Sequence, residues 1–244
     1  MTENDRLNDI AKFYDQETSA HDDGYSSYIC KAEDAIVRNM LLRTLKGKIL
    51  DIGAGSGLMC EMLDIEDYFG IEISPQMTQL AKRKFPEKSF SIADMHHLPF
   101  KSNSFNTIVS LYGPFSYSLE PDKLIDEILR VTQPGGAIVL MPYSLRVAHK
   151  LDIGGYSTAT EESIKKIFYT EEKLREVLND LSSVSVFGIN YFLNTYFRFM
   201  QTMNPNFQGT TKEFEDFLQL EAELGSKLPA ECARHMVAIG YKPY

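Results

Sequence analysis

The stretch KILDIGAGSGLMCEML, residues 48–63, passes from an apolar strand through Asp51 to glycines at 53, 55 and 57 and then into a helix. Glycine lets a loop turn sharply and lets a ligand lie against the backbone, and the helix N-terminus adds free amide groups. The same pattern is also typical of a tight turn that binds nothing. It predicts a strand, a loop and a helix, and it makes the loop a candidate binding site.

Alternating elements continue on both sides of this loop. Short β-rich runs alternate with amphipathic stretches up to residue 141, which is typical of a parallel sheet with crossover helices. The predicted strands are residues 48–52, 68–72, 89–93, 105–111 and 136–141. The predicted helices are residues 31–47, 74–85 and 121–136, the last of them stopping at Pro134 and the two glycines after it.

The pattern changes after residue 141. We expect a helix over 170–181 and strands over 184–189 and 235–241. Residues 191–233, between those strands, are too many for a simple connection, so they must carry structure of their own. We therefore predict one domain over residues 1–244, with an N-terminal helical cap over 1–45 and a helical insertion over 191–233.

Composition narrows the class of protein. The 244 residues are 43% hydrophobic, which suits one sizeable core, and 34 acidic against 25 basic residues give a net charge of −9. This charge disfavours nucleic acid as a partner. The three cysteines fit neither a disulfide framework nor a zinc site, and no apolar run approaches the roughly 18 residues of a membrane span. We expect a cytoplasmic protein with no membrane segment.

The spacing of the glycines separates two classes of cofactor. A dinucleotide-binding fingerprint needs GxGxxG, but its third position falls on Leu58 here, and Gly57 comes one residue early. The glycine spacing, with Asp51 two residues before the first glycine, resembles the first motif of the class I S-adenosylmethionine-dependent methyltransferases. In that family the loop packs against the methionine part of the cofactor, and the acid lies close to its amino end.

Further matches follow in the family's order. In YFGIEIS, residues 68–74, a second strand ends at Glu72, the position where the family uses an acid to accept hydrogen bonds from both ribose hydroxyls. A carboxylate offers the two oxygens that a diol needs. SIADMHHLPFKSNSFNTIVS, residues 91–110, resembles the family's D-x-x-x-LPF-x-x-x-SFD stretch, although Asn106 replaces the last acid. ILRVTQPGGAIVL, residues 128–140, matches the turn and fifth strand. The resemblance is strongest to the small-molecule subgroup that includes the quinone-biosynthesis enzymes.

This resemblance implies a Rossmann-like α/β fold, a doubly wound seven-stranded sheet in the order 3-2-1-4-5-7-6 with the seventh strand antiparallel. It implies S-adenosyl-L-methionine as cofactor and a small-molecule substrate methylated on an O, N or C atom by in-line displacement. The implied cofactor-binding residues are Tyr14, Asp51, Gly53, Ala54, Gly55, Glu72, Ile73, Asp94, Met95 and Leu111.

The acceptor pocket is expected to draw on aromatic segments. LYGPFSYS, residues 111–118, follows the fourth predicted strand, where this family faces the transferring methyl group, and it contains no histidine or carboxylate. The catalytic candidates are His21, Tyr112 and Tyr117, and a dedicated general base is not required because orientation supplies most of the barrier reduction. The substrate-binding candidates are Tyr25, Tyr28, Phe115, Tyr191 and Tyr196.

Several alternatives remain open from the residues. The aromatic start of the 191–233 insertion fits a lid over an apolar substrate, ordinary core, or a contact with another subunit. A nicotinamide-dependent oxidoreductase and a non-catalytic cofactor-binding protein are the competing functions. The histidines at 96, 97, 149 and 235 lack metal-ligand spacing, so we expect no metal site.

Overall fold

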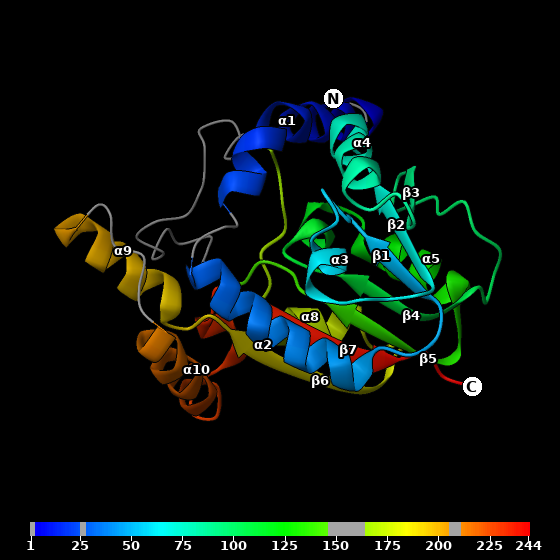
Figure 1. The fold of residues 1–244 in the computed structure, drawn as a ribbon. Coiled ribbons are helices and arrows are strands. Elements are labelled where there is room, and N and C mark those ends of the chain that lie inside the picture. The colour runs from blue at the N-terminus through cyan, green and yellow to red at the C-terminus, as the bar shows by residue number, and fades with distance from the viewer. Residues whose placement is uncertain (1–2, 25–27, 146–163, 205–210) are drawn as a thin grey trace.

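A seven-stranded sheet forms the centre of the computed structural model, which describes residues 3–24, 28–145, 164–204 and 211–244. The strand order is β3-β2-β1-β4-β5-β7-β6, and only β7 runs antiparallel to its neighbours, as the resemblance implied (Figure 1). The strands are β1 (Ile49–Ile52), β2 (Tyr68–Glu72), β3 (Ser89–Ile92), β4 (Phe105–Ser110), β5 (Thr132–Leu140), β6 (Ser182–Ile189) and β7 (His235–Tyr241).

Helices cover both faces of this sheet. Those with described bounds are α1 (Glu3–Gly24), α2 (Tyr28–Thr44), α3 (Leu58–Met62), α4 (Pro75–Lys84), α5 (Pro121–Val131), α8 (Glu171–Val177), α9 (Leu193–Met203) and α10 (Thr211–Gly225). Two short 3-10 turns, η1 (Pro114–Tyr117) and η2 (Ala230–Cys232), complete the described elements. No helix among the described residues is both long and apolar enough to span a lipid bilayer.

The helix starts follow from capping side chains. The hydroxyl of Ser74 accepts a hydrogen bond from the amide of Met77 at the start of α4, and Thr170 caps α8 in the same way. The end of α5 differs from the sequence prediction. The helix stops at Val131, because Thr132 already has an extended backbone and begins β5, so Pro134 and the glycines lie within that strand.

Alternation along β1 divides the core between the two faces of the sheet. Ile49 belongs to the apolar cluster with Val37 and Leu41 of α2, whereas Leu50 packs in the cluster that contains α5 and α8 residues. Successive side chains of a strand point to opposite faces, so Asp51 shares the α2 face with Ile49. The single acid of this buried strand is thereby held under α2 and the loop that follows β1.

A buried polar cluster attaches α2 to the sheet. One carboxylate oxygen of Glu33 lies 2.5 Å from Nδ1 of His235 at the start of β7, and the other accepts from the amide of Asn190 at 3.1 Å. All three side chains are almost fully buried. Burial opposes the ionised form, but the charge and hydrogen bond of His235 lower the pKa of Glu33 overall. This cluster sets the position of the N-terminal part of α2.

The segment between β6 and β7 forms the helical pair α9 and α10, and both helices pack on α2. Glu221 of α10 is buried and accepts hydrogen bonds from the backbone amides of residues 191, 192 and 193. These bonds satisfy donors at the start of α9 that have no partner within the helix. A side chain from one helix therefore fixes the beginning of the other.

Removing the Glu33 carboxylate should destabilise the protein strongly, since His235 and Asn190 would be left buried without their partner. We expect Glu33→Ala to lower the free energy of unfolding by about 3 kcal/mol or more, measured by urea denaturation. Glu223→Ala provides the control because that side chain is 57% exposed and pairs with the exposed Lys227; its effect should stay within about 0.5 kcal/mol. Equal effects of the two variants would contradict the role given to Glu33.

Candidate active site

A cavity of about 460 Å³ lies at the carboxyl ends of β1, β2 and β4. In the sheet, β2 lies on one side of β1 and β4 lies on the other, so the strand order reverses at β1. Ligands of open α/β sheets bind at such switch points. The walls come from the loop after β1, the residues after β2, β3 and β4, and the helices α1 and α2.

The glycine loop contributes bare backbone to this cavity. Gly53 has φ +78° and lies so close to Pro114 that an added Cβ would sit 2.4 Å from its Cγ. Gly55 has φ +54°, and an added Cβ there would meet nothing within 4 Å. The first glycine is therefore required by packing within the protein. The second leaves open space next to the backbone, where a ligand can approach.

Glu72 fastens the loop to the end of β2. One of its carboxylate oxygens accepts from the amide of Gly55 at 2.9 Å, and the other accepts from the amides of Ile73 and Ser74 at 2.8 and 2.9 Å. Burial raises the pKa of Glu72 against these three hydrogen bonds. A carboxylate has about four acceptor positions, so one remains for a ligand hydroxyl.

Asp51 lies beneath the same loop and is 3% exposed. Its Oδ2 accepts a hydrogen bond from the phenol of Tyr68 at 2.8 Å. Burial raises the pKa of Asp51 to about 7, a shift that the Tyr68 hydrogen bond partly opposes and the charge of Glu72 increases. The carboxyl therefore changes charge near neutral pH, and a cation bound beside it would favour the ionised form.

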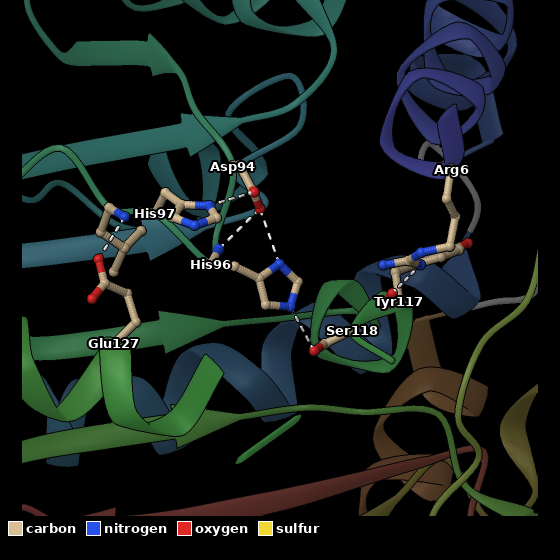
Figure 2. A network of polar contacts seen from close by, with 8 residues as sticks. Arg6, Asp94, His96, His97, Tyr117, Ser118 and Glu127 are labelled. Atoms are coloured by element: carbon tan, nitrogen blue, oxygen red, sulfur yellow. Dashed lines mark hydrogen bonds and ion pairs between the residues drawn. The ribbon is translucent and has the colours of Figure 1, made fainter. Parts of the chain in front are cut away.

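Asp94, after β3, belongs to a polar network at the other end of the cavity. Figure 2 shows its carboxylate between the rings of His96 and His97, each with Nδ1 3.0 Å from an Asp94 oxygen. The second ring nitrogen of His96 lies 2.8 Å from the hydroxyl of Ser118. Although burial opposes ionisation, the hydrogen bonds from His96 and His97 lower the pKa of Asp94 overall. This acid is thus held ionised and oriented on the cavity wall.

Helix α1 covers the cavity from outside the sheet and packs beside α4 (Figure 1). The hydroxyl of Tyr14 donates a hydrogen bond to the hydroxyl of Tyr117 at 3.0 Å. Arg6 donates to the backbone carbonyl of Tyr117 (Figure 2). Asp15 accepts from the hydroxyl of Ser74 and from the amide of Gln76 at the start of α4. The N-terminal segment is therefore a wall of the site.

At the β4 end, the phenol of Tyr112 donates to Asp34 of α2 at 2.5 Å. Burial raises the pKa of Asp34 to about 6, against the lowering effect of the Tyr112 hydrogen bond. Tyr112 has φ +60°, a left-handed conformation that is uncommon for a residue with a side chain. Both residues line the cavity.

The structure brings together every residue that the family resemblance assigned to the cofactor, and two of the catalytic candidates. All of them line the one cavity: Tyr14, Asp51, Gly53, Ala54, Gly55, Glu72, Ile73, Asp94, Met95, Leu111, Tyr112 and Tyr117.

The other candidates are placed elsewhere or lie outside what is described. Phe115 is fully buried against the ring of Tyr169, because η1 turns it into the core. Tyr191 is buried at the start of α9, and Tyr196 donates to Glu213 of α10, so both connect the two insertion helices and neither lines this cavity. His21 and Tyr28 belong to α1 and α2, but their side chains, like the whole of Tyr25, lie outside the described residues.

Sequence analysis missed several residues that line the cavity, above all Asp34, Lys31 and Met62. Asp34 stands beside the apolar stripe of α2, where an acid is usually solvated, and no local signal distinguishes it. Among the described residues, no group of three or more His, Cys, Asp or Glu is arranged to hold a metal ion.

Part of the chain is similar to known proteins. A family model described as a methyltransferase domain matches residues 50–140. Demethylmenaquinone methyltransferase of Paenarthrobacter aurescens is 35% identical over 99 residues, which cover 40% of this chain and 39% of that protein. The ubiquinone/menaquinone biosynthesis C-methyltransferase of Campylobacter jejuni is 32% identical over 124 residues, covering 47% and 50%. The matches therefore span half or less of these relatives' own length.

Solved structures match over nearly the whole chain. The methyltransferase crystallised with the Haloferax volcanii Trm112 methyltransferase activator has a TM-score of 0.64 at 21% identity, covering 95% of this chain and 98% of the other. An S-adenosylmethionine-dependent methyltransferase from Thermotoga maritima also has a TM-score of 0.64, at 16% identity, covering 94% and 98%. At these identities the likeness concerns the fold. In its fold and its matched domain, the chain resembles the class I S-adenosylmethionine-dependent methyltransferases, and among them the quinone-biosynthesis members.

Proposed function

We propose that this protein transfers a methyl group from S-adenosylmethionine to an O, N or C atom of a small organic molecule by in-line displacement. The observation that carries this proposal is the spatial order of the cavity wall. Asp94, Glu72, the open backbone at Gly55 and Tyr112 follow one another along the ends of β3, β2, β1 and β4. This order matches the order of adenine, ribose and amino-acid tail along the cofactor.

The residues present fit that cofactor. Gly55 leaves the space that a side chain would fill, and Glu72 keeps an acceptor position on a carboxylate already oriented by three amides. Apolar side chains of Ile73, Ala93 and Met95 flank this region and suit a flat base. The bound cofactor supplies an electrophilic methyl group on a positively charged sulfur.

The protein's own contribution is mainly orientation. Alignment of the reacting groups can supply about 7 to 11 kcal/mol of barrier reduction in favourable cases, whereas a general base adds about 10²- to 10⁴-fold. Helix α1 closes one side of the cavity through Tyr14 and Arg6, which limits the access of water. We infer that holding the two reactants, rather than acid–base chemistry, is the main task of this site.

The names of the relatives support a small organic acceptor. They are a demethylmenaquinone methyltransferase and a ubiquinone/menaquinone biosynthesis C-methyltransferase, and the methyltransferase-domain match over residues 50–140 includes the loop and strands that build the cavity. The acidic net charge of −9 argues against a nucleic-acid acceptor.

Calorimetric titration with S-adenosylhomocysteine and, separately, with NAD tests the cofactor assignment. We expect saturable binding of the first and none of the second, because Gly57 packs against Phe85, an added Cβ there lying 2.8 Å from its ring, and does not extend the open loop. Transfer of tritium from methyl-labelled S-adenosylmethionine to a metabolite extract would then test catalysis. Binding of NAD instead would refute the proposal.

Alanine at Gly53 and alanine at Gly55 should have different effects. Gly55→Ala adds a methyl group to open space, so it should lower the free energy of unfolding only by the strain of a left-handed residue, about 1–2 kcal/mol. The same methyl group should weaken the binding of S-adenosylhomocysteine by about tenfold or more. Gly53→Ala drives a methyl group into Pro114 and should lower the free energy of unfolding by about 2 kcal/mol beyond that strain. Urea denaturation and calorimetry measure both. Unchanged cofactor affinity in Gly55→Ala would count against a ligand at this loop.

The raised pKa of Asp51 makes the stability of the ligand-free protein depend on pH. Folding raises this pKa from 3.8 to about 7, so the folded state favours the protonated carboxyl. The stability that this preference contributes is present at low pH and is lost as the pH rises through about 7. In Asp51→Asn the amide oxygen still accepts from Tyr68. We expect this variant to have a higher melting temperature than wild type at pH 8, and the difference between the two melting temperatures to shrink toward pH 5.

Thermal unfolding at several pH values measures this. Asp34, with a pKa of about 6, also makes the folded state less stable as the pH rises. The dependence of the melting temperature on pH should therefore be weaker in Asp51→Asn without vanishing. Asp126→Asn, on the exposed face of α5, is the matched control and should follow wild type. Identical pH profiles for wild type and Asp51→Asn would contradict the assignment.

A further inference from the structure

Asp34 and Tyr112 form a pair that the cofactor assignment leaves without a role. They come from α2 and from the residue just after β4, and both line the cavity at the end opposite Asp94. The Tyr112 phenol donates to Oδ1 of Asp34 and lies 3.9 Å from the sulfur of Met62. A carboxylate, an aromatic ring and a thioether therefore meet on one part of the wall.

The surrounding structure holds this pair in place. The left-handed backbone of Tyr112, at φ +60°, persists only where its neighbours over-determine it, and such residues concentrate at functional sites. Its ring meets that of His235 edge-on, with 6.0 Å between centroids. His235 in turn binds Glu33, the residue before Asp34. The buried cluster under α2 thus fixes the carboxylate that faces the cavity.

Asp34 makes no ion pair in the part of the chain that the structure describes, although Lys31 of α2 and Lys84 of α4 line the same cavity. Its neighbouring acids are matched, Glu33 by His235 and Glu61 by Lys84. Asp34 instead receives a neutral phenol, and the charges of Glu33 and Glu61 add to the effect of burial in raising its pKa to about 6. At pH 8 this carboxyl is ionised, and a bound cation would compensate it.

The pair also lies at a defined distance from the ribose-binding position. Neighbouring strands are about 4.8 Å apart, and β4 is two strands from β2, so the carboxyl ends of these two strands lie about 10 Å apart along the sheet edge. With the base at Asp94 and the sugar at Glu72, the group on the 5′ carbon of a nucleoside extends away from Asp94, toward the end of β4 and the pair Asp34 and Tyr112. In the proposed cofactor, that group carries the reacting sulfur.

We propose that Asp34 and Tyr112 form a cation site at the transfer centre, which binds a positive charge carried by the donor sulfonium or by the ammonium group of an amine acceptor. The inference rests on the proposed methyltransferase function. The carboxylate supplies the counter-charge, and the ring face adds the attraction that aromatic groups have for sulfonium and ammonium ions. Such a site favours charged reactants over neutral ones of the same shape.

Three ligands that share adenosine and the amino-acid tail test this, because they differ only at the reacting centre. S-adenosylhomocysteine has a neutral thioether, S-adenosylmethionine has a sulfonium, and sinefungin has a carbon bearing an amine. We expect Asp34→Asn to weaken one or both charged ligands about tenfold relative to S-adenosylhomocysteine at pH 8, measured by calorimetry. Asp126→Asn should leave all three affinities and their ratios at wild-type values.

Each outcome decides a separate point. Loss confined to sinefungin assigns the site to an acceptor ammonium, and loss that includes S-adenosylmethionine assigns it to the donor sulfonium. Equal loss for all three ligands would place Asp34 at the shared tail and overturn the proposal, as would unchanged affinities. If wild type bound none of them, the proposed function itself would fail. Thermal unfolding of each variant, together with Tyr112→Phe, which retains the Asp34 charge and the ring, shows whether folding is preserved.

Discussion

The hydrogen bonds of the Glu72 carboxylate are the interaction on which the site depends. They hold the amides of Gly55, Ile73 and Ser74, so the loop after β1 and the start of α4 share one anchor. On the other side, Gly53 packs directly on Pro114 after β4. Three strand ends are thereby locked to one another. A molecule that lies against Gly55 is positioned with respect to β2 and β4 at once, which a reaction limited by orientation requires.

Five acids line the cavity, and the partners of Asp94, Glu72, Asp51 and Asp34 divide it into two electrostatic regions. Asp94 is satisfied by two histidines, which lower its pKa, and Glu72 is oriented by backbone amides. Asp51 and Asp34 each receive a hydrogen bond from a tyrosine, Tyr68 and Tyr112 respectively, and burial raises both of their pKa values. The first region can recognise neutral hydroxyl and amino groups. In the second region both carboxyls accept from neutral phenols, and the region is suited to a ligand that brings a positive charge.

Helices outside the sheet complete the wall of the cavity. Helix α1 contributes Tyr14 to the wall and joins α4 through Asp15 and Ser74. Helix α2 contributes Asp34, and its position is set by the Glu33 and His235 contact with β7. The insertion helices α9 and α10 pack on α2, so they bear on the site through that helix. The strand ends supply the side of the cavity that we propose for the methyl donor, and these additional helices shape the side that remains.

The sequence by itself determined the strands, their order through the family resemblance, and the residues of the proposed cofactor site, because these depend on local signals. Periodicity, capping residues and glycine spacing act over a few neighbours, and strand order then brings Asp51, Glu72 and Asp94 to one edge. Only the tertiary structure decided that Asp34 meets Tyr112, 78 residues away, and that Phe115 turns into the core. The direction of a side chain on a helix or turn depends on which neighbours cover each face, and those neighbours come from distant parts of the chain.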